Sequence, residues 1–246
     1  MTAHAHRINH QPAFLLTAAP WRESSLWLEM FSRDHGRVAL LARSARKRQS
    51  ELRGVLVPCV PVSASWYGSG ELKTLHRAEW LGGWPQPQGR ALFSALYANE
   101  LVLKLTARED PHPALYDALH KLMRAIAVSD GHTADLRLFE WALLTELGFA
   151  PDLRYDGSGN PIAAGRQYWL RPEHAAEPLD TAVLRPDSHG IAVSGETLVQ
   201  LREAHFTEPA ALQQALRLNR MLLDFLLPEG IKSRQVLQQM QAFQGI

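Results

Sequence analysis

Hydrophobic and polar residues alternate with a period of two through much of the first 80 residues of the chain. Within residues 25–32, for example, Leu26 and Leu28 share one face of an extended chain. This alternation is typical of half-buried β-strands. Two turn-forming sequences, DHGR at 34–37 and YGSG at 67–70, separate the alternating runs. The pattern predicts strands over residues 11–20, 25–32, 38–42, 55–66 and 72–80.

Five short strands in so short a stretch are typical of a small, strongly curved barrel, and the OB-fold is the best-known barrel of this kind. The fourth predicted strand carries Pro58 and Pro61, so we expect it to be an edge strand or a bent one. Barrels of the OB type often bind single-stranded nucleic acid.

A Gly/Pro-rich break, GGWPQPQG at 82–89, ends the alternation, and hydrophobic residues then recur with helical spacing. Gly148 follows the third helical run and is expected to cap it. Residues 150–195 are rich in Pro, Gly and Asp, with short β-like pieces at 167–170 and 191–193. The helical runs cover residues 90–107, 111–128, 133–148, 195–204, 208–227 and 231–243.

These patterns predict an α+β chain of two domains. We expect a five-stranded OB-fold barrel in residues 1–85 and an α-helical domain in residues 86–246. The helical domain would carry a small irregular or β insert at 150–195.

The formal net charge of +1 conceals an uneven distribution. Residues 1–85 hold 11 Lys/Arg and 6 Asp/Glu, a net of +5, whereas residues 86–246 hold 15 and 19, a net of −4. Within the first part, RSARKR at 43–48 has four cations in six residues. Such asymmetry indicates a polyanion-binding module, although a basic hexamer can also be a solvated loop that only aids solubility.

Other classes of protein are disfavoured by what the sequence lacks. With Cys59 as the one cysteine, no internal disulfide or multi-cysteine zinc site is expected, and Cys59 itself is expected to be a small buried residue. No apolar run suits a membrane span and no secretory signal is evident, so we expect a cytoplasmic protein. Phosphate-loop and hydrolase motifs are missing, and the histidines show no ligand spacing. We therefore expect a binding protein rather than an enzyme, with no metal and no cofactor.

Cations of the predicted barrel and its loops are the candidate nucleic-acid contacts, because they can neutralise phosphates. Exposed aromatic residues next to them could stack on unpaired bases. Trp27 and Trp66 have a second interpretation as barrel core, and Arg22 could instead pair with Glu23. The cationic candidates are Arg33, Arg37, Arg43, Arg46, Lys47, Arg48, Arg53, Lys73 and Arg77, and the stacking candidates are Trp27, Trp66 and Tyr67.

Several segments together resemble the bacterial DNA repair and recombination protein RecO family. AFLL at 13–16 and PWRESSLWLEMFSRDHGRVALLARSARKRQS at 20–50 resemble its opening strands, turn and basic segment. YANEL at 97–101 resembles the Y-x-N-E-L of its first helix, and LFEWALLTELGFAPDL at 138–153 a later helix. IKSRQVL at 231–237 resembles the start of its last helix. These pieces occur in the family's order along nearly the whole chain.

The resemblance implies an N-terminal OB-fold, a helical C-terminal domain and a role in the RecF recombination pathway. Such proteins bind single- and double-stranded DNA, anneal complementary strands and help load RecA onto DNA coated by single-strand binding protein (SSB). The implied partners are DNA, the acidic C-terminal tail of SSB, and RecR with the RecF and RecA pathway, at the cytoplasmic nucleoid. Many members carry a four-cysteine zinc module after the third helix. Here the matching RYDGSGNPI at 154–162 has no cysteine, so residues 150–195 are expected to be its metal-free remnant.

A receptor for the SSB tail needs an apolar pocket rimmed by cations. Arg137 is the first candidate, although it could instead be a solvated helix residue. Ser233 is a plausible N-cap of the last helix, and Arg234 is expected to bridge to another element. The full set of tail candidates is Arg137, Arg124, Lys121, Leu136, Phe139 and Leu143.

Two other readings of the chain stay open. It could be an OB-fold module that binds RNA or tethers partners outside recombination, which competition between DNA and RNA strands would reveal. A hydrolase built from scattered His and Asp residues would need a nucleophile–base constellation, which the sequence does not show.

Overall fold

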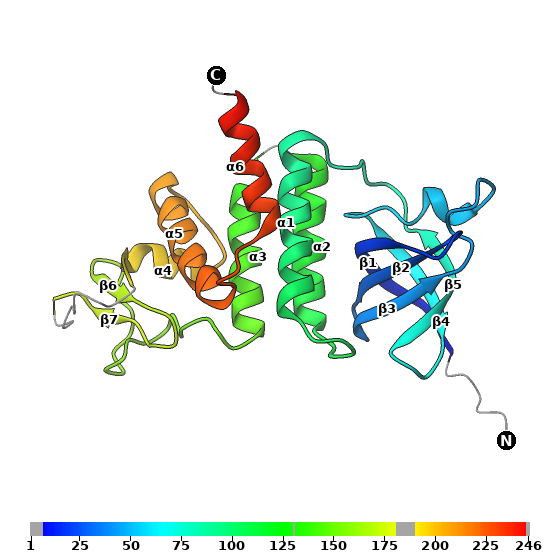
Figure 1. Cartoon of the computed structure of the whole chain (residues 1–246). Helices are drawn as coiled ribbons and strands as arrows, with labels where there is room; N and C mark the ends of the chain where they lie inside the picture. Colours follow the sequence, from blue (N-terminus) through cyan, green and yellow to red (C-terminus); the bar gives the residue numbers. More distant parts are fainter. Residues whose placement is uncertain (1–6, 130, 181–189, 245–246) are drawn as a thin grey trace. The chain divides into compact units, whose positions relative to one another are not determined.

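The structure is a computed structural model that describes residues 7–129, 131–180 and 190–244, with side chains up to residue 240 (Figure 1). The chain forms two compact units. Unit 1 comprises Met1–Asp130 together with Ile231–Ile246, and unit 2 comprises Gly131–Gly230. The last helix therefore belongs with the first two helices and the barrel. The prediction from sequence instead grouped all the helices together in residues 86–246.

Unit 1 contains the expected barrel of five strands, which is closed (Figure 1). The strand order is β1-β2-β3-β5-β4, with β1 pairing to both β2 and β4, and β3 running parallel to β5. The predicted α+β class with an OB-type barrel is thus confirmed. The strands are β1 Arg7–Trp21, β2 Ser25–Ser32, β3 Gly36–Ala42, β4 Pro61–Tyr67 and β5 Leu72–Trp80.

Two strands differ from their predicted bounds. Strand β1 is longer than 11–20, and register shifts between Leu15 and Thr17 and between Ile8 and Gln11 let it curve between its two neighbours. Strand β4 begins only at Pro61, because the chain before it forms turns and the 3₁₀ helix η1, Glu51–Gly54.

The alternation of the strands decides which side chains fill the barrel. Leu28, Met30, Leu40, Val62 and Trp66 all point inward and are at most 1% exposed. Phe14 and Phe31 lie on the other face of their strands, where both pack against Tyr116 of α2. Burial of both faces of these strands joins barrel and helices into one hydrophobic unit.

Three helices complete unit 1: α1 (Gly89–Leu105), α2 (Pro113–Val128) and α6 (Lys232–Gln244). Asn99 of α1 is buried and donates from Nδ2 to the carbonyl oxygen of Leu15 in β1, at 3.1 Å. Among the described residues, no helix is long and apolar enough to cross a membrane.

Unit 2 combines α3 (Thr133–Glu146), α4 (Gly195–Arg202) and α5 (Pro209–Leu226) with a small sheet of order β7-β6-β8. Gly148 has the positive φ of +78° that a C-terminal cap needs, as predicted. The sheet strands are β6 Gln167–Leu170, β7 Glu177–Pro178 and β8 Ile191–Ser194.

The stretch that resembles a zinc module is held by its own backbone and by Asp156. Oδ1 of this buried carboxylate accepts the backbone N–H groups of Ser158 and Asn160, both at 2.9 Å. The segment contains no sulfur ligand, and the described residues contain no group of three or more His, Cys, Asp or Glu that could hold a metal ion. These residues do not fit the zinc site of the family's four-cysteine members. Residues 181–189 of this insert lie outside the described chain.

Candidate nucleic-acid interface

The basic loop, residues 43–53, follows β3 and is ordered by local hydrogen bonds. The backbone N–H of Arg46 donates to the carbonyl oxygen of Ser24 at 2.8 Å, which ties the loop to the β1–β2 turn. Ser44 adopts a φ of +56°, and the following Ala45 is buried. Successive turn hydrogen bonds then lead into η1. The loop is therefore a shaped surface rather than a solvated tether.

The cations of the basic loop are exposed, and their charge is not neutralised within the described residues. Arg43, Lys47, Arg48 and Arg53 have no ion pair there. Arg46 donates from Nη1 to the carbonyl oxygens of Arg22 and Glu23, at 3.2 and 3.3 Å, which orients its guanidinium but leaves the positive charge. An Arg22–Glu23 ion pair, the alternative given for Arg22, is not formed among the described residues. A concentration of exposed positive charge of this kind attracts polyanions.

A small pocket of about 260 Å³ opens beside the basic loop. Four apolar side chains and two arginines line it, namely Leu26, Ala45, Leu52, Leu56, Arg46 and Arg53.

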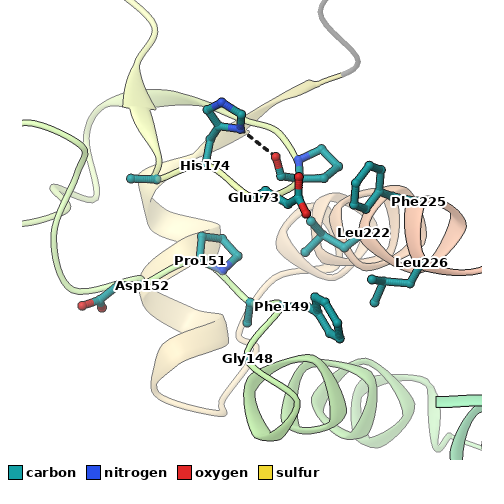
Figure 2. Close-up of a pocket in the computed structure, with 12 residues that line it drawn as sticks. Gly148, Phe149, Pro151, Asp152, Glu173, His174, Leu222, Phe225 and Leu226 are labelled. Carbon is teal, nitrogen blue, oxygen red and sulfur yellow. Dashed lines mark hydrogen bonds between the residues drawn. The ribbon is translucent and has the colours of Figure 1, made fainter.

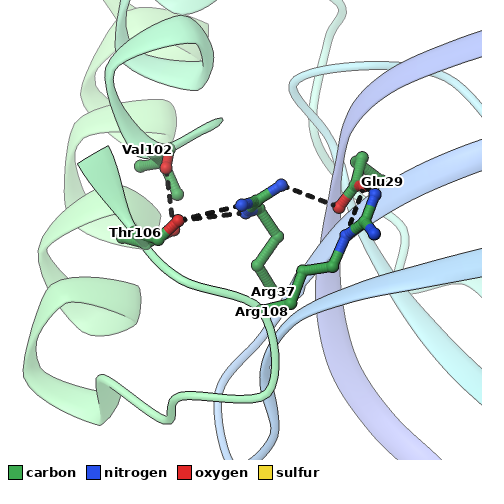
Figure 3. A network of polar contacts seen from close by, with 5 residues as sticks. All are labelled: Glu29, Arg37, Val102, Thr106 and Arg108. Atoms are coloured by element: carbon green, nitrogen blue, oxygen red, sulfur yellow. Dashed lines mark hydrogen bonds and ion pairs between the residues drawn. The ribbon is translucent and has the colours of Figure 1, made fainter. Parts of the chain in front are cut away.

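Arg37 was expected to contact DNA, but it belongs to an internal network (Figure 3). Its Nη1 pairs with Oε2 of Glu29 at 3.2 Å, while Nε and Nη2 donate to the carbonyl oxygen of Thr106 at 3.3 and 3.0 Å. Arg108 pairs with the other oxygen of Glu29, whose side chain is 1% exposed. A buried carboxylate requires such partners, so Arg37 has a structural position.

Three further cations that were expected to face DNA have acidic partners instead. Arg33 holds Asp117 of α2 in a bidentate pair with both distances 3.0 Å, which lowers the pKa of that carboxyl. Lys73 pairs with Glu109, and its side chain is 13% exposed. Arg77 pairs with Glu79 at 2.6 Å. The barrel surface thus offers fewer free charges than its sequence indicates.

The stacking candidates differ in exposure. Trp66 is 1% exposed in the barrel core, with the ring of His35 edge-on at 5.4 Å, so the core interpretation holds and its ring cannot stack on a base. Trp27 is half-buried, with the guanidinium of Arg108 at 5.7 Å from its ring centroid. Tyr67 is half-buried beside His76.

In unit 2, Arg137 is buried rather than rimming a pocket. Its Nη2 pairs with Oε1 of Glu140 at 2.7 Å, and Asn219 of α5 donates to the Arg137 carbonyl oxygen and to Glu140 Oε2. Phe139 and Leu143 are core residues, 2% and 0% exposed, so they do not form an exposed pocket wall beside Arg137.

The remaining tail candidates fall into two groups. Leu136 on α3 is half-buried. Lys121 and Arg124 are exposed on α2, and Arg124 lines a pocket with Trp84, Ala127 and Val128.

A larger pocket of about 470 Å³ lies in unit 2, between α5 and the loops around Phe149 and His174 (Figure 2). Phe149 and Phe225 are 42% and 50% exposed there. Its lining contains no Lys or Arg, so it lacks the cationic rim that an acidic tail requires.

Sequence pattern does not reveal the acidic and basic partners that remove cations from the surface, above all Glu29 and Arg108. The position of Glu29, a charged residue within the alternating strand 25–32, was the one indication in the sequence that it needs a cationic partner. Arg108 lies in the linker after α1 and had no local signal, because its partner is 79 residues away.

Comparison with known proteins is consistent with this architecture of a barrel followed by helices. Residues 7–84 match the family model described as recombination protein O N terminal, and residues 86–235 match recombination protein O C terminal. The fold and the matches together define a DNA repair protein of the recombination class. The chain belongs to the RecO family.

Individual relatives named DNA repair protein RecO align with this chain over almost their full length. A DNA repair protein RecO of Neisseria meningitidis serogroup B is 62% identical over 239 residues, which cover 97% of this chain and 91% of the relative. The RecO of Neisseria gonorrhoeae is 63% identical, covering 97% of both chains. The RecO of Chromobacterium violaceum is 43% identical, covering 96% of this chain and 97% of the relative.

Proposed function

We propose that the protein is a recombination mediator that binds single- and double-stranded DNA through the basic loop, anneals complementary strands and helps load RecA onto SSB-coated DNA. The observation that supports this proposal is the contrast in charge pairing on the barrel. The basic loop presents five exposed cations against the one carboxylate of Glu51, while Arg33, Arg37, Lys73 and Arg77 have acidic partners.

Annealing by this surface needs no catalytic group. Two DNA strands repel each other through their phosphates, and a protein cation lowers that repulsion by displacing condensed counterions. The bases stay available, and their pairing then supplies the free energy. We accordingly propose a mediator that is not an enzyme and that acts in the cytoplasm, at the nucleoid, without a metal or cofactor.

For the SSB tail, the proposed receptor moves from Arg137 to the pocket beside Arg124. Trp84, Ala127 and Val128 supply an apolar wall, and the exposed guanidinium of Arg124 stands at its rim. An acidic peptide that ends in an apolar residue fits that combination. Lys121, one helical turn earlier, adds a second cation. RecR and the RecF and RecA pathway are the other proposed partners, by family membership.

The DNA-binding proposal is tested by reversing Arg46, Lys47 and Arg48 to Glu together. The expected result is a large loss of affinity for DNA at low salt and a flatter dependence of log affinity on log salt, measured by fluorescence anisotropy. The matched control reverses three exposed arginines of unit 2, Arg154, Arg217 and Arg220, which changes the net charge equally. Equal losses in both variants would mean that the basic loop is not the site.

The alternative of an RNA-binding or tethering module is addressed by competition. Single-stranded DNA and RNA of equal length and sequence are compared as competitors of a labelled DNA strand, and an annealing assay is run alongside. Preference for RNA with no annealing activity would favour the alternative.

A further inference from the structure

The pocket beside the basic loop combines apolar walls with a cationic rim. Its walls are aliphatic, with Leu26 from β2 and Leu52 and Leu56 from the η1 region, all partly buried against the barrel core. Its rim carries the guanidinium groups of Arg46 and Arg53, both exposed. A ligand that fills it should therefore present an apolar group next to negative charge.

The pocket is shaped before any ligand arrives. The backbone N–H of Leu56 donates to the carbonyl oxygen of Leu52 at 2.9 Å, which fixes the two leucines on one turn. The hydrogen bonds from Arg46 Nη1 to the β1–β2 turn hold the opposite rim. A preorganised site avoids most of the ordering cost of binding.

Single-stranded nucleic acid has the matching chemistry, since each nucleotide joins a planar base to an anionic phosphate. In a duplex the bases are stacked and paired, so only the phosphates are available there. We infer that this pocket receives one unpaired nucleobase of a DNA strand, while Arg46 and Arg53 contact the adjoining phosphates. This inference rests on the proposed DNA-binding function of the basic loop and adds a reason for that loop to distinguish single from double strands.

Three further cations outside the pocket, which have no ion pair among the described residues, strengthen the assignment. Arg43, Lys47 and Arg48 extend the positive charge along the chain from the rim, and a polynucleotide supplies a matching row of phosphates on both sides of the captured base. A short acidic peptide with an apolar C-terminal residue could also enter an apolar, cation-rimmed pocket. It would leave most of that row without a partner.

The test removes pocket surface without changing charge. Leu52→Ala widens the pocket, Leu52→Phe narrows it, and Val57→Ala is the control, because Val57 is half-buried in the same segment and does not line the pocket. Loss of one base contact is expected to weaken single-strand binding by about tenfold in both Leu52 variants. Duplex affinity and the salt dependence are expected to stay as in the unchanged protein, and thermal unfolding verifies that each variant is folded.

The DNA is varied in parallel, with an oligonucleotide in which abasic residues replace the nucleotides. The unchanged protein is expected to bind this abasic strand about as weakly as Leu52→Ala binds the intact strand. The affinity of Leu52→Ala should not fall any further when the intact strand is replaced by the abasic one. If the unchanged protein binds intact and abasic strands equally, or if Val57→Ala loses as much as both Leu52 variants, the inference is overturned.

Two controls separate this inference from the broader proposal. One outcome supports DNA binding by the basic loop but contradicts the base pocket. In it, the unchanged protein binds the intact and abasic strands equally, and reversal of Arg46, Lys47 and Arg48 abolishes binding of both. If that reversal leaves DNA binding intact, the proposed site itself fails. The inference would also be overturned if Leu52 were needed for binding an acidic peptide that ends in Phe but not for binding single-stranded DNA. The pocket would then be assigned to a peptide.

Discussion

The carboxylate of Glu100 on α1 accepts two hydrogen bonds from Ser233 at the start of α6, one from its backbone N–H and one from its hydroxyl, each at 2.8 Å. The other carboxylate oxygen accepts the backbone N–H of Lys232, also at 2.8 Å. A residue 133 positions earlier in the sequence thus caps the last helix. Ser233, expected to be the cap itself, is instead a donor to the residue that does the capping.

Two other residues of the YANEL segment also make polar contacts within unit 1. Tyr97 accepts a hydrogen bond from Arg234 at 3.3 Å, with the guanidinium 5.6 Å from its ring centroid. Asn99 reaches the barrel at Leu15. The polar residues of this motif therefore assemble unit 1, and the predicted bridging role of Arg234 is confirmed.

Glu100→Gln should destabilise the protein by about 2 kcal/mol at neutral pH, because charge-assisted hydrogen bonds to three donors are weakened. Burial alone would raise the pKa of Glu100, but the hydrogen bonds from Ser233 and Lys232, together with the nearby positive charge of Lys104, outweigh it and lower the pKa from its ordinary 4.5. The stabilisation is therefore present in full above that ordinary value and is lost as the pH falls through the lowered folded-state pKa.

Urea unfolding of both proteins across this pH range measures the effect, with the exposed Glu51→Gln as control. A difference between unchanged protein and Glu100→Gln that stays constant down to the acid limit would contradict the assigned role of the carboxylate.

Arg37 and Arg48 are expected to separate folding from DNA binding. Arg37→Ala leaves the buried Glu29 with Arg108 as its remaining cation and should lower the free energy of unfolding by about 2–4 kcal/mol. Arg48→Ala should leave stability within about 0.5 kcal/mol and reduce the slope of log affinity against log salt by about one. Denaturant unfolding and DNA anisotropy on both variants provide the comparison. If Arg37→Ala is folded and loses as much DNA affinity as Arg48→Ala, Arg37 is part of the DNA interface after all.

Gly36 is expected to be irreplaceable, because the β2–β3 turn meets the linker after α1 at this position. Its φ is +63°, and a Cβ atom there would lie 2.0 Å from the carbonyl oxygen of Asp110. Gly36→Ala should therefore cost about 2–4 kcal/mol of stability, by thermal or urea unfolding. Gly70→Ala is the control, since nothing lies within 4 Å of its Cβ position. Similar small effects at both glycines would show that the linker can move away.

The thiol of Cys59 is expected to be unreactive in the folded protein. The side chain is buried, and burial raises its pKa from the ordinary 9.0 to about 12, so very little thiolate forms at pH 8. Labelling with an aromatic disulfide should become rapid only in urea, whereas an exposed thiol introduced by Ser69→Cys should react at once. Fast labelling of the native unchanged protein would contradict this placement.

The strands and helices followed from local pattern, with bounds that differ by a few residues. Periodicity of two and of 3.6 reports which face of an element is buried, and that information lies within the element itself. The start of β4 was misplaced because the β-rich residues 55–60 form turns and irregular chain after η1. The inward position of Trp66 could not be chosen from sequence, since an aromatic residue suits both a barrel core and a base-stacking surface.

Local sequence pattern does not predict which charged residues of the barrel form ion pairs. Arg33, Arg37 and Arg48 look alike in sequence, but Arg33 meets Asp117 across 84 residues and Arg37 meets the buried Glu29. The sequence by itself determined the barrel, the helices, the family and a positively charged first third, because periodicity and composition are properties of neighbouring residues. Only the tertiary structure decided which cations remain free, because an ion pair is made by residues that folding brings together from distant parts of the chain.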